Sequence, residues 1–127
     1  MKIIIAGVNG IIGTFLYDKL RLEHTVTGLG SKEKSNVTDY YPIDLLKTNL
    51  VENLVESLPK YDVLIYLVGL AHKKGKGKDI AEFRNINKQT LVNFLSTLDK
   101  RNKLPGKIIF ASTISVYGEN MDNIIYT

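Results

Sequence analysis

The chain contains no cysteine and no apolar run long enough for a membrane span. Without cysteine it can form neither a disulfide framework nor a cysteine-based zinc site, and this composition fits a reducing cytoplasm. The longest apolar stretch, residues 63–71, is too short to cross a bilayer, and the residues after Lys2 do not resemble a cleavable leader. We therefore expect a cytoplasmic protein that makes no membrane contact.

The excess of positive over negative charge is also small. Seventeen Lys and Arg against thirteen Asp and Glu give a formal net charge of +4. The main basic cluster, residues 72–78, contains no aromatic side chain, which favours a solvated loop over a nucleic-acid surface. His72 in this cluster has no second ligand at a metal-binding spacing. We expect neither nucleic acid nor a metal ion among the partners.

The chain does have the composition and the periodicity of a globular domain. It has 127 residues, of which 44% are hydrophobic and 24% charged, which is enough for one domain with its own core. Strands are expected at residues 3–6, 24–29, 40–43, 61–68 and 107–111, and helices after the first strand and at residues 46–58 and 79–101. This alternation predicts an α/β fold with a doubly wound parallel sheet and right-handed crossovers.

A glycine-rich turn after the first apolar strand is the most informative segment. Gly7, Gly10 and Gly13 are spaced three apart, and apolar residues follow at helical spacing at positions 12, 15, 16 and 20. In such a strand–turn–helix unit the first glycine permits the tight turn, and the second lets a pyrophosphate approach the backbone. The third lets the helix lie close to its strand. The alternative is that these glycines only form a tight turn.

Five segments carry motifs in a fixed order along the chain. They are Gly7-x-x-Gly10-x-x-Gly13, Asp44-Leu45, and residues 63–71, 83–90 and 110–118. Together they resemble the extended short-chain dehydrogenase/reductase family, in particular its nucleotide-sugar epimerases and dehydratases. The last three are similar to the V-I-H-L-A-A strand, the F-x-x-x-N-x-x-x-T helix and the S-S/T-x-x-V-Y-G segment of that family. The resemblance implies a Rossmann fold, an NAD or NADP cofactor, a nucleotide-sugar substrate and a homodimer for the intact enzyme.

The resemblance also implies roles for individual residues. Thr113 corresponds to the catalytic hydroxyl of the family, which would donate a hydrogen bond to a substrate oxygen. Asp44 and Leu45 correspond to the pair that holds the adenine ring, and the end of the fourth strand passes the nicotinamide ribose. The implied cofactor-binding residues are Gly7, Asn9, Gly10, Ile11, Ile12, Gly13, Ser31, Lys32, Asp44, Leu45, Leu67, Val68, Gly69, Asn87 and Ser112.

Some of these residues have a structural alternative. The hydroxyls of Ser112 and Thr113 could serve only to satisfy backbone groups at a strand end. Asn87 lies on or beside the apolar face of the helix expected at residues 79–101. Its amide needs hydrogen-bond partners there whether its role is structural, functional or both.

The end of the second strand departs from the family pattern. NAD-specific members usually carry an acid there, which accepts hydrogen bonds from the adenosine ribose, whereas this chain has Gly30 followed by Ser31 and Lys32. Without the carboxylate a 2′-phosphate is not repelled, and Ser31 and Lys32 could contact it. This favours NADP over NAD, although Lys32 could equally be a solvated surface residue.

A second departure concerns the catalytic Tyr-x-x-x-Lys pair, which the family places after the Ser/Thr. None of the seven tyrosines is followed by a lysine four positions later. We therefore expect residues 1–127 to be the N-terminal, NAD(P)-binding portion of such an enzyme, with five strands, no substrate-binding domain, no activity alone and a tendency to self-associate. A catalytically inactive NAD(P)-binding sensor or regulator is the alternative. A flavodoxin-like signalling domain is a third possibility, which the glycine turn disfavours.

Overall fold

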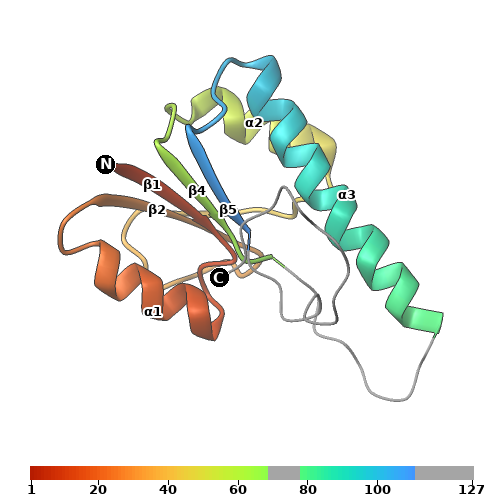
Figure 1. The fold of residues 1–127 in the computed structure, drawn as a ribbon, viewed down its shortest axis with the longest axis horizontal. Helices are drawn as coiled ribbons and strands as arrows, with labels where there is room; N and C mark the ends of the chain where they lie inside the picture. Colours follow the sequence, from red (N-terminus) through yellow and green to blue (C-terminus); the bar gives the residue numbers. More distant parts are fainter. Residues whose placement is uncertain (69–77, 111–127) are drawn as a thin grey trace.

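The computed structural model describes the backbone of residues 1–68 and 78–110 and the side chains of residues 1–68 and 87–110. Its elements are β1 (Lys2–Ala6), α1 (Ile11–Leu20), β2 (Thr25–Gly30), β3 (Tyr40–Pro42), α2 (Thr48–Ser57), β4 (Val63–Tyr66), α3 (Lys78–Lys100) and β5 (Lys107–Phe110). The strands form one parallel sheet in the order β3-β2-β1-β4-β5 (Figure 1). The predicted doubly wound α/β fold is confirmed, and the strand order reverses between β1 and β4.

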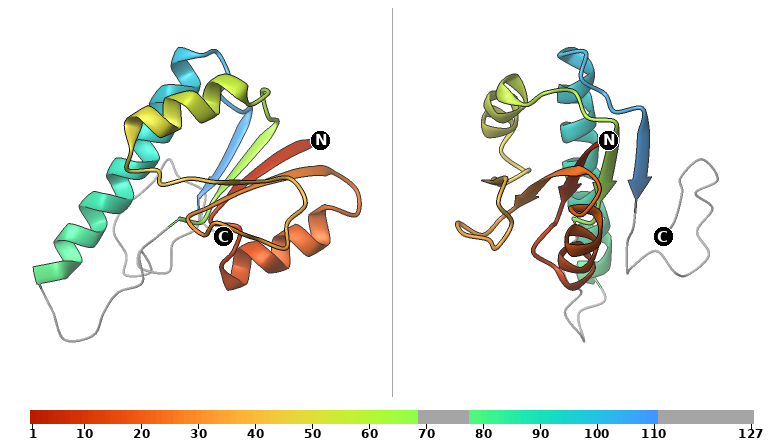
Figure 2. Two further views of the ribbon diagram at one scale, coloured as in Figure 1. Left: turned by 180° about the vertical axis from the view of Figure 1, so that it is seen from behind. Right: turned by 90° about the vertical axis from the view of Figure 1, so that its left-hand side faces the viewer.

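The centre of the sheet is buried on both faces. All four residues of β4 and the last four of β1 are buried, as expected for apolar strands covered by helices on both sides. Ile4 and Leu64 pack in a cluster with α2 and α3, whereas Ile5 and Ile65 pack in a second cluster with Tyr17 of α1. Figures 1 and 2 show the resulting three layers, with α1 on one face and α2 and α3 on the other.

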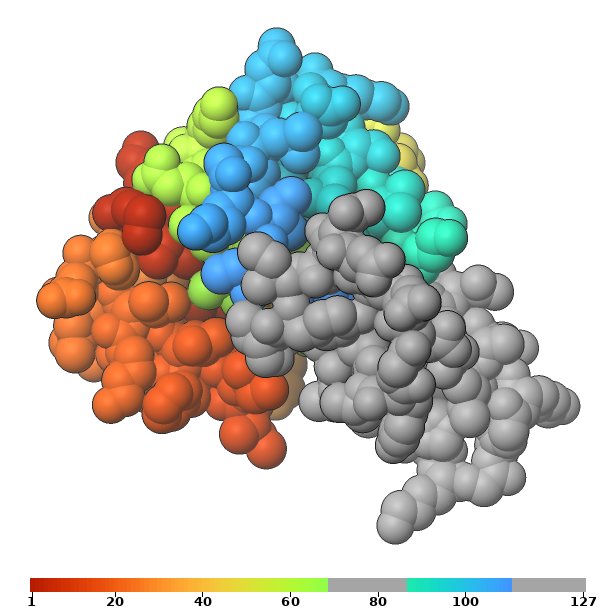
Figure 3. Space-filling model, in the orientation of Figure 1, coloured from red at the N-terminus to blue at the C-terminus, as the bar shows by residue number. Residues whose placement is uncertain are grey.

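Helix α1 differs from what its apolar spacing suggests. Leu16 is half-buried against the sheet, but Ile12 and Phe15 are 47% and 60% exposed. The buried positions of this helix are Gly13 and Tyr17. Because Gly13 lies against the backbone of the preceding turn, it rotates the helix so that the side with Ile12 and Phe15 faces outward. Figure 3 shows α1 at the surface of the molecule.

Helix α3 packs through its C-terminal half as its periodicity predicts. Phe94 and Leu98 are buried, and Leu91 and Leu95 are half-buried against the same cluster. The side chains of the other apolar positions expected on this face, at residues 80, 83 and 86, are outside the described residues. No helix within residues 1–68 and 78–110 is both long and apolar enough to span a bilayer.

Candidate functional site

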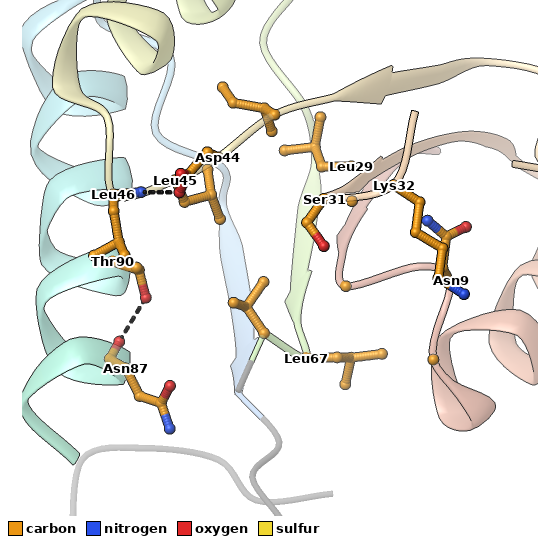
Figure 4. Close-up of a pocket in the computed structure, with 15 residues that line it drawn as sticks. Asn9, Leu29, Ser31, Lys32, Asp44, Leu45, Leu46, Leu67, Asn87 and Thr90 are labelled. Atoms are coloured by element: carbon orange, nitrogen blue, oxygen red, sulfur yellow. Dashed lines mark hydrogen bonds between the residues drawn. The ribbon is translucent and has the colours of Figure 1, made fainter. Parts of the chain in front are cut away.

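The carboxyl ends of β1, β2, β3 and β4 open into a cavity of about 410 Å³. It lies where the strand order reverses, which is where open parallel α/β sheets bind their ligands. Figure 4 shows one wall formed by the glycine turn and the end of β2, and the opposite wall formed by α3 and the loop before α2. The lining residues are Gly7, Asn9, Gly10, Leu29, Gly30, Ser31, Lys32, Ile43, Asp44, Leu45, Leu46, Leu67, Val68, Asn87 and Thr90.

The glycine turn is held against both neighbouring strands. The backbone N–H groups of Gly7 and Val8 donate to the carbonyl of Leu29 at 2.9 and 3.1 Å. Gly7 has a φ of +86°, which favours glycine, and an added Cβ would lie 2.9 Å from the carbonyl carbon of Leu67. The turn therefore has a fixed position between the ends of β2 and β4.

Gly10 and Gly13 are glycines for different reasons. An added Cβ at Gly13 would lie 2.4 Å from the carbonyl oxygen of Gly7, so the helix can lie this close only with glycine there. At Gly10 the nearest atom would be 3.6 Å away, which is ordinary contact, and the backbone is extended. Packing against the described residues thus gives no reason for glycine at position 10, whereas a ligand seated on the cavity side of its backbone would explain it.

The first turn of α1 can serve such a ligand. Its N-cap residue is Gly10, which has no side chain and so offers no capping oxygen to the N–H groups of the first turn. Together with the positive end of the helix dipole, free N–H groups suit a phosphate group. The glycine turn and the first turn of α1, which we call the phosphate cradle, could therefore hold the pyrophosphate of a dinucleotide.

Asp44 is fixed on the opposite side of the cavity. The backbone N–H of Leu46 donates to Asp44 Oδ1 at 3.0 Å, and the N–H of Lys47 donates to the Asp44 carbonyl at 3.0 Å. Leu45 and Ile43 beside it belong to the buried core and also line the cavity. An oriented acceptor next to apolar side chains suits a flat ring that carries an amino group.

A neutral polar network occupies the end of β2, where the family pattern has an acid. Asn9 Nδ2 donates to the Tyr40 hydroxyl at 3.0 Å, and Ser35 Oγ donates to Asn9 Oδ1 at 2.6 Å. The Tyr40 hydroxyl in turn donates to the carbonyl of Lys32. An added Cβ at Gly30 would lie 2.5 Å from Asn9 Nδ2 and 2.7 Å from the Tyr40 hydroxyl. A side chain at position 30 would therefore have to displace the ends of the Asn9 and Tyr40 side chains.

A second cavity of about 540 Å³ lies on the other side of this network. Asn9 and Lys32 line both cavities. The second cavity is also lined by Lys34, with Ser35 and Asn36 on the same loop. It therefore adds a second lysine beside the end of β2.

The predicted cofactor-binding residues fall into three groups. Ten line the first cavity: Gly7, Asn9, Gly10, Ser31, Lys32, Asp44, Leu45, Leu67, Val68 and Asn87. Ile11, Ile12 and Gly13 lie in the first turn of α1 and are not among the lining residues. Gly69, Ser112 and the catalytic candidate Thr113 lie outside the described residues, as does most of the basic cluster at 72–78. That any of these residues binds a cofactor stays a prediction.

Five of the lining residues are absent from the predicted cofactor-binding residues, namely Leu29, Gly30, Ile43, Leu46 and Thr90. Leu29 and Ile43 could have been found, because they stand at the carboxyl ends of expected strands. Thr90 is one helical turn after Asn87 and therefore shares its face. Within the described ranges, no cluster of three or more His, Asp or Glu side chains could hold a metal ion.

Comparisons with known proteins agree with this architecture. The UDP-glucose 4-epimerase of Bifidobacterium longum superimposes with a TM-score of 0.74 at 22% identity, over 93% of this chain and 38% of that one. For the UDP-N-acetylglucosamine 4-epimerase of Bacillus cereus the values are 0.70, 22%, 98% and 43%. For the UDP-glucose 4-epimerase of Thermus thermophilus they are 0.74, 21%, 97% and 41%. The chain thus spans less than half the length of these proteins.

A search of curated proteins found no match. The model of the NAD dependent epimerase/dehydratase family, in contrast, matches residues 3–126. Since that match takes in the glycine turn, all five strands and nearly every other residue, the chain belongs to the NAD dependent epimerase/dehydratase family.

Proposed function

We propose that this chain is the coenzyme-binding part of an NAD(P)-dependent enzyme that epimerises or dehydrates a nucleotide-linked sugar. The observation that carries the proposal is the cavity at the carboxyl ends of the strands, with the bare backbone of Gly10 at its edge. Family membership supports it, as do the similar structures of UDP-sugar epimerases, one of which is a complex with NAD+ and UDP.

Each part of the cavity has a counterpart in the coenzyme. Gly7, Gly10 and the first turn of α1 would bind the pyrophosphate, and Asp44 with Leu45 would hold the adenine. Leu67 and Val68, which follow β4, would line the nicotinamide end. When bound, the nicotinamide supplies a hydride acceptor and donor. The residues of this chain bind and orient it, and the proposed hydroxyl of Thr113 would hydrogen-bond the substrate oxygen.

We further propose that the site prefers NADP to NAD. Lys32 lines both cavities, and Lys34 lines the second. No carboxylate stands at position 30 to repel a 2′-phosphate, since this residue is Gly30 and the neutral Asn9–Tyr40 pair lies beside it. Lysine near a phosphate contributes about 1.5–3 kcal/mol, so the preference should be roughly ten- to a hundredfold and should shrink as salt rises.

Titration calorimetry with NAD+, NADP+ and, as a control, FMN tests both proposals. We expect both dinucleotides to bind, NADP+ more tightly, and FMN not to bind. Lys32→Ala should remove most of the preference, whereas Lys60→Ala, which changes an exposed lysine at the amino-terminal side of β4, should leave it unchanged. Binding of neither dinucleotide would contradict the proposed function, and equal affinities would contradict only the preference.

A further inference from the structure

A buried tyrosine joins β4 to the α3 wall of the cavity without lining the cavity. Tyr66 is the last residue of β4 and is fully buried. Its hydroxyl donates to Thr90 Oγ1 at 2.9 Å, and Thr90 Oγ1 donates to the carbonyl of Asn87 at 2.9 Å. Thr90 and Asn87 both line the cavity, whereas Tyr66 is not among the lining residues. Figure 4 shows Thr90 and Asn87 on the α3 wall, one turn apart.

The same ring also contacts β5. Tyr66 and Phe110 are register partners on adjacent strands, and their rings stack with centroids 6.1 Å apart and an interplanar angle of 14°. Phe110 precedes Ser112 and Thr113 by two and three residues in the sequence. One side chain therefore contacts β5 just before the segment that carries the proposed catalytic hydroxyl, and α3 at the turn that faces the cavity.

The described side chains of α3 pack against the core at residues 91–98, beyond this turn. Figure 1 shows the N-terminal part of α3 extending away from α2. Asn93 Nδ2 donates to the Leu45 carbonyl in the loop before α2 at 3.4 Å and to Thr48 Oγ1 in the first turn of α2 at 3.2 Å. Among the described side chains of residues 90–100, no hydrogen bond other than that of Tyr66 to Thr90 joins α3 to a strand.

We propose that Tyr66 is a positioning residue, which holds the Asn87–Thr90 turn of α3 at the distance from β4 that coenzyme binding requires. The inference rests on the proposed NAD(P) site. Burial keeps the pKa of the Tyr66 hydroxyl high, at about 12, so the group remains a donor throughout the neutral range. The bond to Thr90 is therefore insensitive to pH in the range in which the site would work.

The chain offers a matched control on the same helix. Thr97 is as buried as Thr90, and its hydroxyl donates to the carbonyl of Asn93 at 2.8 Å, but it does not bond to a strand or line the cavity. Thr97→Val therefore removes a buried hydroxyl from α3 without touching the Tyr66 link. Tyr66→Phe keeps the stacked ring and removes only the donor, and Thr90→Ser keeps the acceptor whereas Thr90→Val removes it.

Hydrogen exchange of the coenzyme-free chain tests the positioning step by itself. Tyr66→Phe and Thr90→Val should each accelerate amide exchange at residues 87–91 relative to residues 97–100. Thr90→Ser keeps the acceptor and should exchange at the rates of the unsubstituted chain. Thr97→Val should not accelerate exchange at residues 87–91. Unchanged exchange at these residues in Tyr66→Phe would overturn the proposal.

Calorimetry with NADP+ then tests the consequence for the site. Tyr66→Phe should weaken binding by about three- to tenfold, the effect of one lost hydrogen bond, while its urea midpoint falls no further than that of Thr97→Val. The double variant Tyr66→Phe/Thr90→Val should bind no more weakly than Thr90→Val alone, because both changes break one link. Parent-like binding in Tyr66→Phe, or fully additive losses, would overturn the proposal. If the parent binds neither dinucleotide, the proposed function fails and this inference fails with it.

Discussion

At the scale of single residues, the three glycines of the first turn separate into packing and binding positions. Gly7 and Gly13 have no room for a Cβ, because backbone atoms lie 2.9 and 2.4 Å from its position. Among the described residues, Gly10 has room for a Cβ, and a ligand that lies against its backbone would explain why it is glycine. Spacing predicted all three roles from the sequence, and for Gly7 and Gly13 the contacts agree with the predicted roles.

This distinction predicts different consequences of substitution. Gly10→Val should keep the far-ultraviolet circular dichroism spectrum but weaken NAD(P) binding by about ten- to a hundredfold, because the methyl groups occupy the pyrophosphate position. Gly106→Val is a matched control, since an added Cβ there also meets only one carbonyl at 3.6 Å and the residue does not line the cavity. Calorimetry decides the matter: if Gly10→Val binds as tightly as Gly106→Val, the phosphate cradle lies elsewhere.

The polar network at the end of β2 could not be predicted from the sequence. Asn9 and Tyr40 are 31 residues apart, and only the parallel pairing of β2 and β3 brings the tyrosine beside the glycine turn. The sequence did show that position 30 lacks an acid. It did not show that the Asn9 amide and the Tyr40 hydroxyl lie where a Cβ at position 30 would be.

Two buried tyrosines predict how stability responds to alkaline pH. Burial raises the pKa of Tyr66 to about 12, and it also raises the pKa of Tyr61. Because an unfolded chain ionises tyrosine near pH 10, the unfolded state holds fewer protons between about pH 10 and 12, and stability falls as the pH rises through this window. For Tyr66 alone the loss amounts to about 3 kcal/mol.

Urea unfolding at pH 8, 10 and 11 measures this loss. The free energy of unfolding should decline above pH 10 in the parent, and the decline should be smaller in Tyr66→Phe. Below pH 9 the free energy of unfolding should change with pH in the same way in the two proteins. A decline of the same size in both proteins would mean that Tyr66 ionises as readily in the folded chain as in the unfolded one.

At the scale of elements, strands were easier to predict than helix orientation. The apolar runs at residues 3–6 and 61–68 correspond to β1 and β4, because residues buried on both faces leave a continuous hydrophobic signal. The run at residues 107–111 contains the half-buried strand β5. For α1 the apolar period identified the buried face only in part. Leu16 and Leu20 pack against the core, but Ile12 and Phe15 are exposed, and the buried Gly13 contributes no side chain. Close backbone approach outweighed side-chain hydrophobicity at this position.

Helix α2 is capped by a residue that lies far away in the sequence. Lys103 Nζ, from the connection between α3 and β5, donates to the carbonyls of Val55 and Glu56 at 2.8 and 3.0 Å. These carbonyls belong to the last turn of α2, where acceptors lack helical partners and a positive charge is favourable. The interaction joins the ends of two elements that pack side by side.

Removing this ammonium group should destabilise the fold. Lys103→Met keeps most of the stem and should lower the free energy of unfolding by about 1–2 kcal/mol, as expected for charge-assisted hydrogen bonds that are partly exposed. Lys100→Met, which changes an exposed lysine in the last turn of α3, should have a smaller effect. Equal urea midpoints for the two variants would show that the cap contributes nothing measurable.

At the scale of the whole molecule, the location of the cavity followed from the topology. Parallel strands end at one edge of the sheet, so the residues after β1, β3 and β4 were expected to meet, and they do. The α3 wall was harder to predict from the sequence, because whether Asn87 and Thr90 reach the cavity depends on how α3 packs against the sheet. The Tyr66–Thr90 contact, which spans 24 residues, has no signature in the sequence.

The outer surface of the described fold contains two features that favour association. β5 pairs with β4 on one side, and within the described sheet it is an edge strand with backbone groups free to pair. Elsewhere on the surface, Ile11, Phe15 and Leu22 are 92%, 60% and 72% exposed. Unpaired strand edges and apolar patches both recruit other chains.

We therefore expect the 127-residue chain to self-associate at high concentration. Light scattering should give a mass above the 14.3 kDa of the monomer, increasing with concentration. Phe15→Lys places a charge in the exposed side of α1 and should lower the apparent mass without changing the urea midpoint, because the side chain makes no core contact. Leu50→Lys is the control, since Leu50 is comparably exposed at 46% but lies on α2, and it should leave the mass unchanged. An unsubstituted chain that stays at 14.3 kDa would contradict the expectation. Equal effects of the two lysine substitutions would show that the exposed side of α1 has no specific role in the association.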